Sequence, residues 1–160
     1  MTGGAAMLVD AQTDFVSPPP KPSMVHDVPT LATRDRLSKE EADLRAEIQA
    51  YASLTDNWDG EGAAAPPAQA VRDAIEFLGG RPDGIPLPLP EVASIGDVGI
   101  YWDEDGIFAE VQFGGDQAYS YYAQRKAARD VVEEYGNDSI VLAQGWPQDM
   151  VQLLRQLDKS

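Results

Sequence analysis

Apolar residues recur every three to four positions between Ser38 and about Leu54, which predicts a helix with one buried stripe formed by Leu44, Ile48 and Tyr51. Ser38 and Glu41 have the Ser-x-x-Glu spacing of a capping box, in which each side chain satisfies one free backbone N–H. We therefore expect the helix to begin at Ser38.

A second helix is predicted after Pro66-Pro67, because proline suits the first helical turn and Gly79-Gly80 provides an end. Its apolar positions are Val71, Ala74, Ile75 and Leu78. Prolines at positions 82, 86, 88 and 90 then remove backbone donors, so residues 81–90 are expected to form an extended connector.

The region from Val92 to Ala123 is typical of an antiparallel sheet. Asp105-Gly106 has the composition of a two-residue hairpin turn. That turn fixes a register in which one face pairs Trp102 with Ala109, Ile100 with Val111 and Val98 with Phe113, and the other face pairs Tyr101 with Glu110. A second turn at residues 114–116 leads into residues 118–123, where the pattern leaves open whether Tyr119 and Tyr121 or Tyr122 join the core face.

The C-terminal third predicts three further elements. Residues 124–135 have helix-forming composition and stop at Gly136-Asn137, and residues 139–143 suit a short buried strand. A last helix is expected from Trp146-Pro147, with a wide apolar face. The expected fold class is therefore α+β, with an antiparallel three- to four-stranded sheet packed against N-terminal, middle and C-terminal helices.

Residues 1–36 show no sustained periodicity and contain the run Ser17-Pro18-Pro19-Pro20, which is typical of exposed polyproline II. We expect a flexible, proline-rich tail over residues 1–36 and a single domain over residues 37–160. Met1 to Asp10 carry no basic segment and only a short apolar patch, so neither a signal peptide nor a membrane span is expected. The absence of cysteine is compatible with a reducing cytoplasm.

Few residues suited to catalysis are present. There is no cysteine, and the one histidine, His26, falls in the expected tail, where nothing rigid would position it. Phosphate-loop and dinucleotide signatures are missing. The sequence therefore predicts a protein that is not an enzyme and that needs no cofactor.

Two acidic segments could in principle hold a metal ion. Asp56, Asp59 and Glu61 surround Trp58 in a glycine-rich loop, and Asp103-Glu104-Asp105-Gly106 superficially resembles a calcium loop. The second lacks the calcium-loop spacing and fits a solvated hairpin turn better. In the first, Asn and Asp beside glycine favour bracing of the loop, with Trp58 filling the core between the two helices. No metal site is predicted, although a carboxylate-based hydrolase remains an alternative.

Charge is the most informative property of the chain. Its formal net charge is −15, and no lysine or arginine occurs between Arg81 and Arg125, where eight carboxylates fall. Such a surface repels nucleic acid and anionic membrane and attracts basic proteins. The acidic groups alternate with tyrosines, which are enriched at protein interfaces. The residues expected to bind a partner are Tyr101, Asp103, Glu104, Asp105, Phe108, Glu110, Asp116, Tyr119 and Tyr121.

Residues Asn57 to Pro66 read Asn-Trp-Asp-Gly-Glu-Gly-Ala-Ala-Ala-Pro, and this segment resembles the Asn-Trp-Asp-Gly-x-Gly-Ala-x-x-Pro motif of a family of small uncharacterised bacterial proteins. The resemblance extends from about Leu37 to Tyr122 and includes Phe77-Leu78, Gly115-Asp116 and Tyr121-Tyr122. It implies a bacterial or phage origin and a shared fold, and it assigns no activity. Residues 124–135 look like an addition to the family pattern.

Together these features predict a non-enzymatic inhibitor that engages a basic partner such as a nuclease or another nucleic-acid-binding protein. An immunity or antitoxin-like factor, or a phage-encoded anti-defence protein, would act in this way by presenting carboxylates in place of phosphates. A metal-dependent hydrolase and a structural or scaffold component are the alternatives. The sequence leaves the oligomeric state open.

Overall fold

The computed structural model describes residues 31–157, so His26 and the first 30 residues of the expected tail lie outside the described residues. The chain divides into two units between Glu40 and Glu41. Within the first unit, the described residues are helical, and Arg36 Nε lies 3.6 Å from Glu40 Oε1. The second unit, Glu41–Ser160, contains the sheet and the core.

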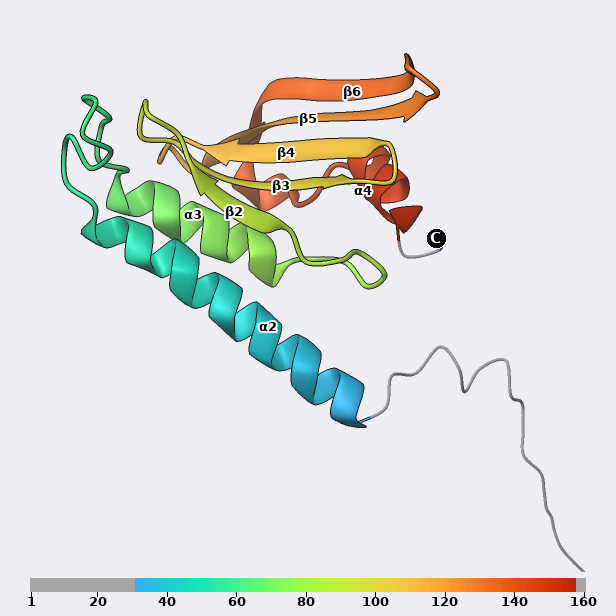
Figure 1. Cartoon of the computed structure of the whole chain (residues 1–160), viewed down its shortest axis with the longest axis horizontal. Helices are drawn as coiled ribbons and strands as arrows, with labels where there is room; N and C mark the ends of the chain where they lie inside the picture. The colour runs from blue at the N-terminus through green and yellow to red at the C-terminus, as the bar shows by residue number, and fades with distance from the viewer. Residues whose placement is uncertain (1–30, 158–160) are drawn as a thin grey trace, which may run out of the picture. The chain divides into compact units, whose positions relative to one another are not determined.

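The second unit has an α+β fold built on a five-stranded antiparallel sheet in the order β2-β3-β4-β5-β6 (Figure 1). The strands are β2 Leu89–Val92, β3 Val98–Glu104, β4 Ile107–Phe113, β5 Ala118–Ala127 and β6 Asp130–Val141. The helices are α2 Leu31–Ala50, α3 Ala68–Gly79 and α4 Gln148–Leu154, with short 3-10 turns η1 Tyr51–Ser53 and η2 Leu142–Gln144. The α+β prediction is confirmed, but the sheet has five strands where three to four were expected.

The central hairpin has the predicted register. Trp102 pairs with Ala109, Ile100 with Val111 and Val98 with Phe113, while Tyr101 lies opposite Glu110. Asp105 and Gly106 both have positive φ, of 54° and 79°, as the mirror-image hairpin turn requires. The turn chemistry and the alternation agree here, which is why the register could be predicted.

The core lies between one face of the sheet and the helices. α3 packs on β3 and β4, and α4 packs on β4 and β5. The rings of Phe77 and Trp146 stack with centroids 4.2 Å apart, and the indole of Trp146 donates a hydrogen bond to the Phe77 carbonyl. These contacts join α3 to the segment that precedes α4.

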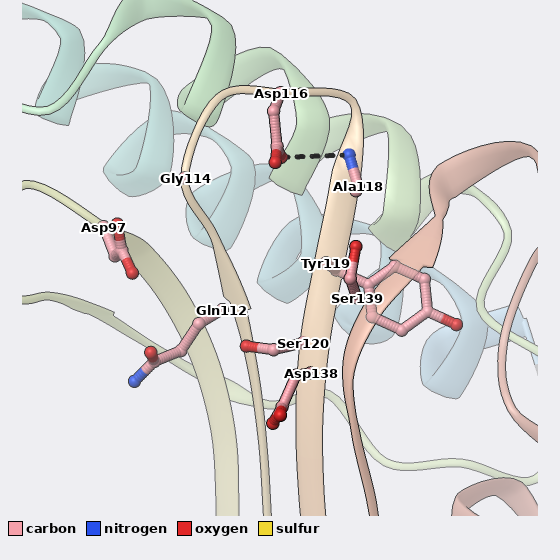
Figure 2. A pocket seen from close by; sticks show the side chains of 9 residues that line it. All are labelled: Asp97, Gln112, Gly114, Asp116, Ala118, Tyr119, Ser120, Asp138 and Ser139. Atoms are coloured by element: carbon pink, nitrogen blue, oxygen red, sulfur yellow. Dashed lines mark hydrogen bonds between the residues drawn. The ribbon is translucent and has the colours of Figure 1, made fainter.

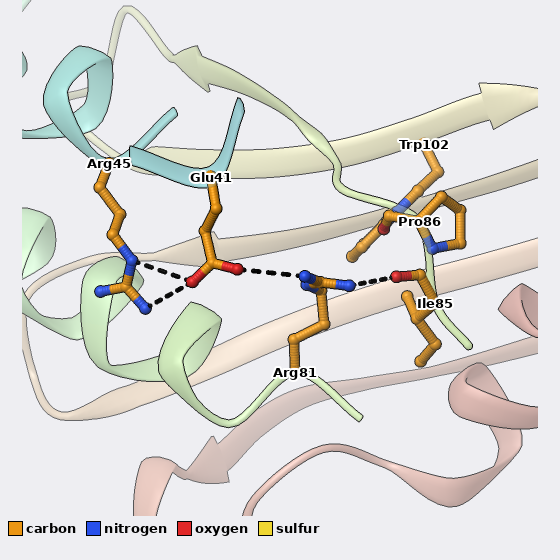
Figure 3. Close-up of polar contacts among 6 residues, drawn as sticks. All are labelled: Glu41, Arg45, Arg81, Ile85, Pro86 and Trp102. Atoms are coloured by element: carbon orange, nitrogen blue, oxygen red, sulfur yellow. Dashed lines mark hydrogen bonds and ion pairs between the residues drawn. The ribbon is translucent and has the colours of Figure 1, made fainter. Parts of the chain in front are cut away.

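Arg81 links α2 to the connector that leads into the sheet (Figure 3). Its Nη2 lies 3.1 Å from Glu41 Oε1, and its Nη1 donates a hydrogen bond to the Ile85 carbonyl. Arg45 contacts the other carboxylate oxygen of Glu41. Burial raises the pKa of Glu41, but the hydrogen bonds from Arg81 and Arg45 outweigh it, so the pKa is lowered overall. Glu41 therefore stays ionised between the two guanidinium groups.

Several predicted boundaries were wrong. α2 begins at Leu31, so Ser38 lies inside the helix and the expected tail boundary at residue 36 falls within it. Residues 31–37 are rich in leucine, alanine and arginine, which favour helix. The expected connector over residues 81–90 ends in a strand, because β2 begins at Leu89 and, as an edge strand, accommodates Pro90. Pro147 is the N-cap of α4 rather than its first residue.

The largest error concerns residues 124–143. The predicted helix over residues 124–135 is instead the end of β5 and the start of β6, and the predicted strand over residues 139–143 is the end of β6 followed by η2. β5 and β6 are joined by a two-residue turn in which Ala127 pairs with Asp130 and Ala128 has a φ of 60°. Alanine rarely adopts a left-handed conformation, so its presence does not indicate a turn. The helix-forming composition of residues 124–135 therefore led to the wrong prediction.

Candidate functional site

The face of the sheet that points away from α3 and α4 is built from alternate residues of all five strands. Side chains alternate along a strand, and residues directly opposite each other share a face. Tyr101 pairs with Glu110, and Glu110 pairs with Tyr122, so these three side chains form one row. We call this surface the open face; it comprises Leu89, Glu91, Tyr101, Asp103, Phe108, Glu110, Gln112, Ser120, Tyr122, Gln124 and Glu134.

The open face carries four carboxylates, on Glu91, Asp103, Glu110 and Glu134. The basic residue that shares its alternation is Lys126, near the far end of β5. The residue before Lys126, Arg125, lies on the other face of the sheet, and its Nε is 2.5 Å from Glu133 Oε2. Over most of the open face, therefore, no basic side chain on the same face offsets the negative charge.

Two of these carboxylates lie side by side. Burial, and after it the negative charge of the nearby Glu110 carboxylate, raises the pKa of Glu91 above its ordinary value. Gln112 Nε2 lies 3.5 Å from Glu110 Oε2. A positive charge placed over this pair would relieve the repulsion between the two groups.

Aromatic side chains lie among the carboxylates. Tyr101, Phe108 and Tyr122 are partly exposed, in contrast to the buried residues that alternate with them. The Tyr122 hydroxyl donates to the Glu134 carboxylate, and that hydrogen bond raises the pKa of Tyr122. Partly exposed aromatic rings beside acidic groups provide both apolar area and charge for a partner surface.

A polar pocket adjoins the open face where β3 begins and β4 ends (Figure 2). Burial, and secondarily the negative charge of Asp116, raises the pKa of Asp97. Asp116 Oδ1 accepts a hydrogen bond from the Ala118 backbone N–H at 3.3 Å, as drawn in Figure 2. The lining residues are Asp97, Gln112, Gly114, Asp116, Ala118, Tyr119, Ser120, Asp138 and Ser139. The pocket thus extends the negative surface beyond the strands.

The structure separates the residues that were expected to bind a partner. Tyr101, Asp103, Phe108 and Glu110 share the open face. The exposed residues Glu104 and Asp105 lie at the hairpin turn at one end, whereas Asp116 lines the pocket at the other. The open face therefore has an acidic segment at each end of the β3–β4 hairpin.

Tyr119 and Tyr121, which were expected to bind a partner, are on the core face of the sheet. They are 2% and 9% exposed, and their hydroxyls donate to the Gly145 carbonyl and the Asp149 carboxylate. Burial, followed by the effect of Asp149, raises the pKa of each to about 12. The alternative left open by the sequence is thereby decided: Tyr122 occupies the open face, and the other two support the core.

Three acidic or aromatic residues of the open face were absent from the predicted site: Glu91, Tyr122 and Glu134. Glu91 and Tyr122 could have been found by extending the predicted alternation by one strand on each side of the central hairpin. Glu134 could not, because its segment was expected to be helical. Placing it on this face requires the β5–β6 pairing.

The loop at residues 56–62 is braced by its own side chains, as the sequence predicts. Asp59 Oδ1 accepts hydrogen bonds from the backbone N–H groups of Glu61 and Ala63, which lower the pKa of Asp59. Asn57 Oδ1 accepts one from Gly62. Trp58 is only partly buried and donates to the Ala64 carbonyl, so it does not fill the core as expected. Among the side chains that the structure describes, no group of three or more acidic or histidine residues is arranged to hold a metal ion.

Comparison of the chain with protein-family models, with curated proteins and with solved structures finds no match in any of the three. The resemblance based on the Asn57–Pro66 motif therefore stays a prediction. In the part of the chain that the structure describes, none of the helices is both long and apolar enough to cross a membrane.

Proposed function

We propose that this protein is a non-enzymatic acidic inhibitor that binds a basic partner protein through the open face. The observation that carries the proposal is the row formed by Tyr101, Glu110 and Tyr122, with Glu91 beside Glu110. It places carboxylates among aromatic rings on a surface without a basic residue at its centre. A partner's lysine and arginine side chains would neutralise the carboxylates while its apolar groups cover the rings.

A purely solvating role explains this surface less well. Surfaces that serve solubility usually mix both signs of charge. The helices show that pattern: Arg36 pairs with Glu40, and Arg45 pairs with Glu41. On the open face, by contrast, Glu91 and Glu110 repel each other. A surface that retains such repulsion is better explained by attraction of a basic ligand.

The partner class follows from the charge. A continuous negative surface competes for the positively charged groove that a nuclease or another nucleic-acid-binding protein uses for phosphates. The protein would then act as a nucleic-acid mimic in the cytoplasm, as an immunity or antitoxin-like factor or a phage-encoded anti-defence protein does. Neither nucleic acid nor membrane is proposed as a direct ligand.

Affinity capture from the native host with three matched baits tests the proposal. The baits are the wild type, the open-face variant E91Q/E110Q/E134Q, and a control variant E47Q/E76Q/D83N that removes the same charge from other described acidic side chains. We expect a basic protein to be captured by the wild type and the control and lost with the open-face variant. Equal capture by all three baits would remove the open face as the binding surface.

A further inference from the structure

Exposed valines gather on one strand of the sheet. Among the side chains that the structure describes, five large hydrophobic residues are exposed. Three of them, Val131, Val132 and Val141, belong to β6, with exposures of 46%, 47% and 56%. β6 has 12 residues and forms the edge of the sheet opposite β2, with no other described strand beyond it (Figure 1). A long edge strand presents unpaired backbone donors and acceptors to any strand that can match its side chains.

The two halves of β6 have matching geometry around Gly136. β6 has one extra residue relative to β5 on each side of Gly136. One extra residue lies between Asn137 and Ile140, and the other lies between Val131 and Glu133. Val131 lies opposite Lys126, and Val141 lies opposite Ala118. These two β5 residues are eight positions apart on a regular strand, so Val131 and Val141 project to the same side of the sheet.

We infer that β6 pairs antiparallel with β6 of a second copy of this chain, around a twofold axis at Gly136. In that register Val131 of each copy faces Val141 of the other, and Val132 lies beside Ile140 of the other. An isologous contact requires a self-complementary surface, and the apolar ends and the glycine centre of β6 provide one. The two sheets would join into a single sheet of ten strands.

Apolar side chains, and not charge, favour a second copy over a basic strand at this edge. Glu133 is already paired with Arg125, and Glu134 accepts a hydrogen bond from Tyr122, so two acidic groups of β6 are engaged within the chain. The other two acidic residues of β6, Asp130 and Asp138, are exposed, and the valines at the ends of β6 are positions that a lysine-rich strand would not match. The cost of self-pairing is the approach of Glu134 to Asp138 of the second copy and the repulsion between two chains of net charge −15. Added salt should therefore strengthen the dimer.

Sedimentation equilibrium of the full chain at protein concentrations up to about 0.5 mM, a range that detects small interfaces, tests the inference. We expect a shift from monomer towards dimer that is larger at about 0.5 M salt than at about 0.05 M, since salt screens the repulsion. The variants V131K and V141E should each remain monomeric, whereas the control I95K, which changes an exposed apolar residue outside β6, should dimerise like the wild type.

The double variant V131K/V141E defines the register. The introduced lysine of one copy would face the introduced glutamate of the other, so the double variant should regain the dimer that each single variant loses. Melting curves of all variants establish that they fold. A monomeric wild type under every condition, dimerisation of both single variants, or failure of the double variant to recover would each overturn the inference. A monomer whose β6 amides resist hydrogen exchange on the outer edge would show instead that another segment of the chain covers it.

Discussion

Glu91 lies across Gly99 on the neighbouring strand, so closely that a Cβ atom on residue 99 would stand 2.9 Å from Glu91 Cγ and Oε2. The missing side chain of Gly99 lets the Glu91 carboxyl reach towards β4, where it meets Glu110. An unrelieved pair of carboxyl groups on the open face thus depends on a glycine of β3.

The pairing makes stability depend on pH in a defined direction. Because the pKa of Glu91 is raised in the folded state, its contribution to stability is present at acidic pH and is lost as the pH rises through the raised value. In the wild type, the unfolding free energy should therefore fall between acidic and neutral pH, and E91Q should make this fall smaller. The difference should be less than about 1 kcal/mol, because solvent screens a partly exposed pair. Urea unfolding of both proteins across this pH range measures the effect. An identical pH dependence would show that the pair contributes nothing.

G99A should displace Glu91 with little effect on folding, because the atoms that a new Cβ would meet belong to a flexible side chain. We expect the pKa of Glu91 to move back towards its ordinary value as the carboxyl leaves Glu110. Titration of the side-chain carboxyl carbons by NMR follows this directly, with Asp97 as an internal reference that should not move. An unchanged Glu91 titration would mean that the contact with Glu110 survives the substitution.

Asp73 ties α3 to the turn between β4 and β5. It is the buried charged residue of the described chain, and its carboxylate accepts hydrogen bonds from the Gln117 backbone N–H at 2.9 Å and from Gln69 Nε2 at 2.7 Å. D73A should cost about 1–3 kcal/mol of unfolding free energy, because it leaves the Gln117 donor without its partner. D73N, which keeps an acceptor oxygen, should cost less. The urea midpoints of the two variants test this, and equal losses would argue against the hydrogen bond to Gln117 as the cause.

A128G should stabilise the protein by about 0.5–1 kcal/mol, since relief of a left-handed alanine outweighs the backbone entropy of glycine. Ala128 has a φ of 60° in the β5–β6 turn. The reverse change, G106A, serves as the control: Gly106 has a φ of 79° and its added Cβ would lie 3.0 Å from the Lys126 carbonyl oxygen, so stability should fall. Thermal unfolding of both variants gives the signs, and a destabilised A128G would show that the turn does not strain residue 128.

The two hairpins illustrate how far the sequence determines this fold. At Asp105-Gly106 the turn residues carry their own conformational preference, so the register of β3 and β4 and the pairing of Tyr101 with Glu110 could be predicted. At Ala128 the turn is imposed by the long β5–β6 pairing, and local helix propensity points the other way. Tertiary pairing outweighs local preference there, and no short-range signal reveals it.

The candidate site divides in the same way. Tyr101, Phe108 and Glu110 follow from the predicted hairpin, whereas Tyr119 and Tyr121 could not be placed because a shift of one residue exchanges the two faces of a strand. Glu134 joins the open face only through β6. Composition indicated an acidic surface, and the strand register shows which of its carboxylates and rings lie together.

The most direct test of the open face as a docking surface is titration of the full chain with an unstructured lysine-rich peptide at low salt, where electrostatic attraction is strongest, followed through backbone amide resonances. We predict that the largest shift changes occur at Tyr101, Phe108, Glu110 and Tyr122, and that added salt abolishes them. Changes of equal size around Glu47 and Glu76 on the helices, or none on the open face, would contradict the account.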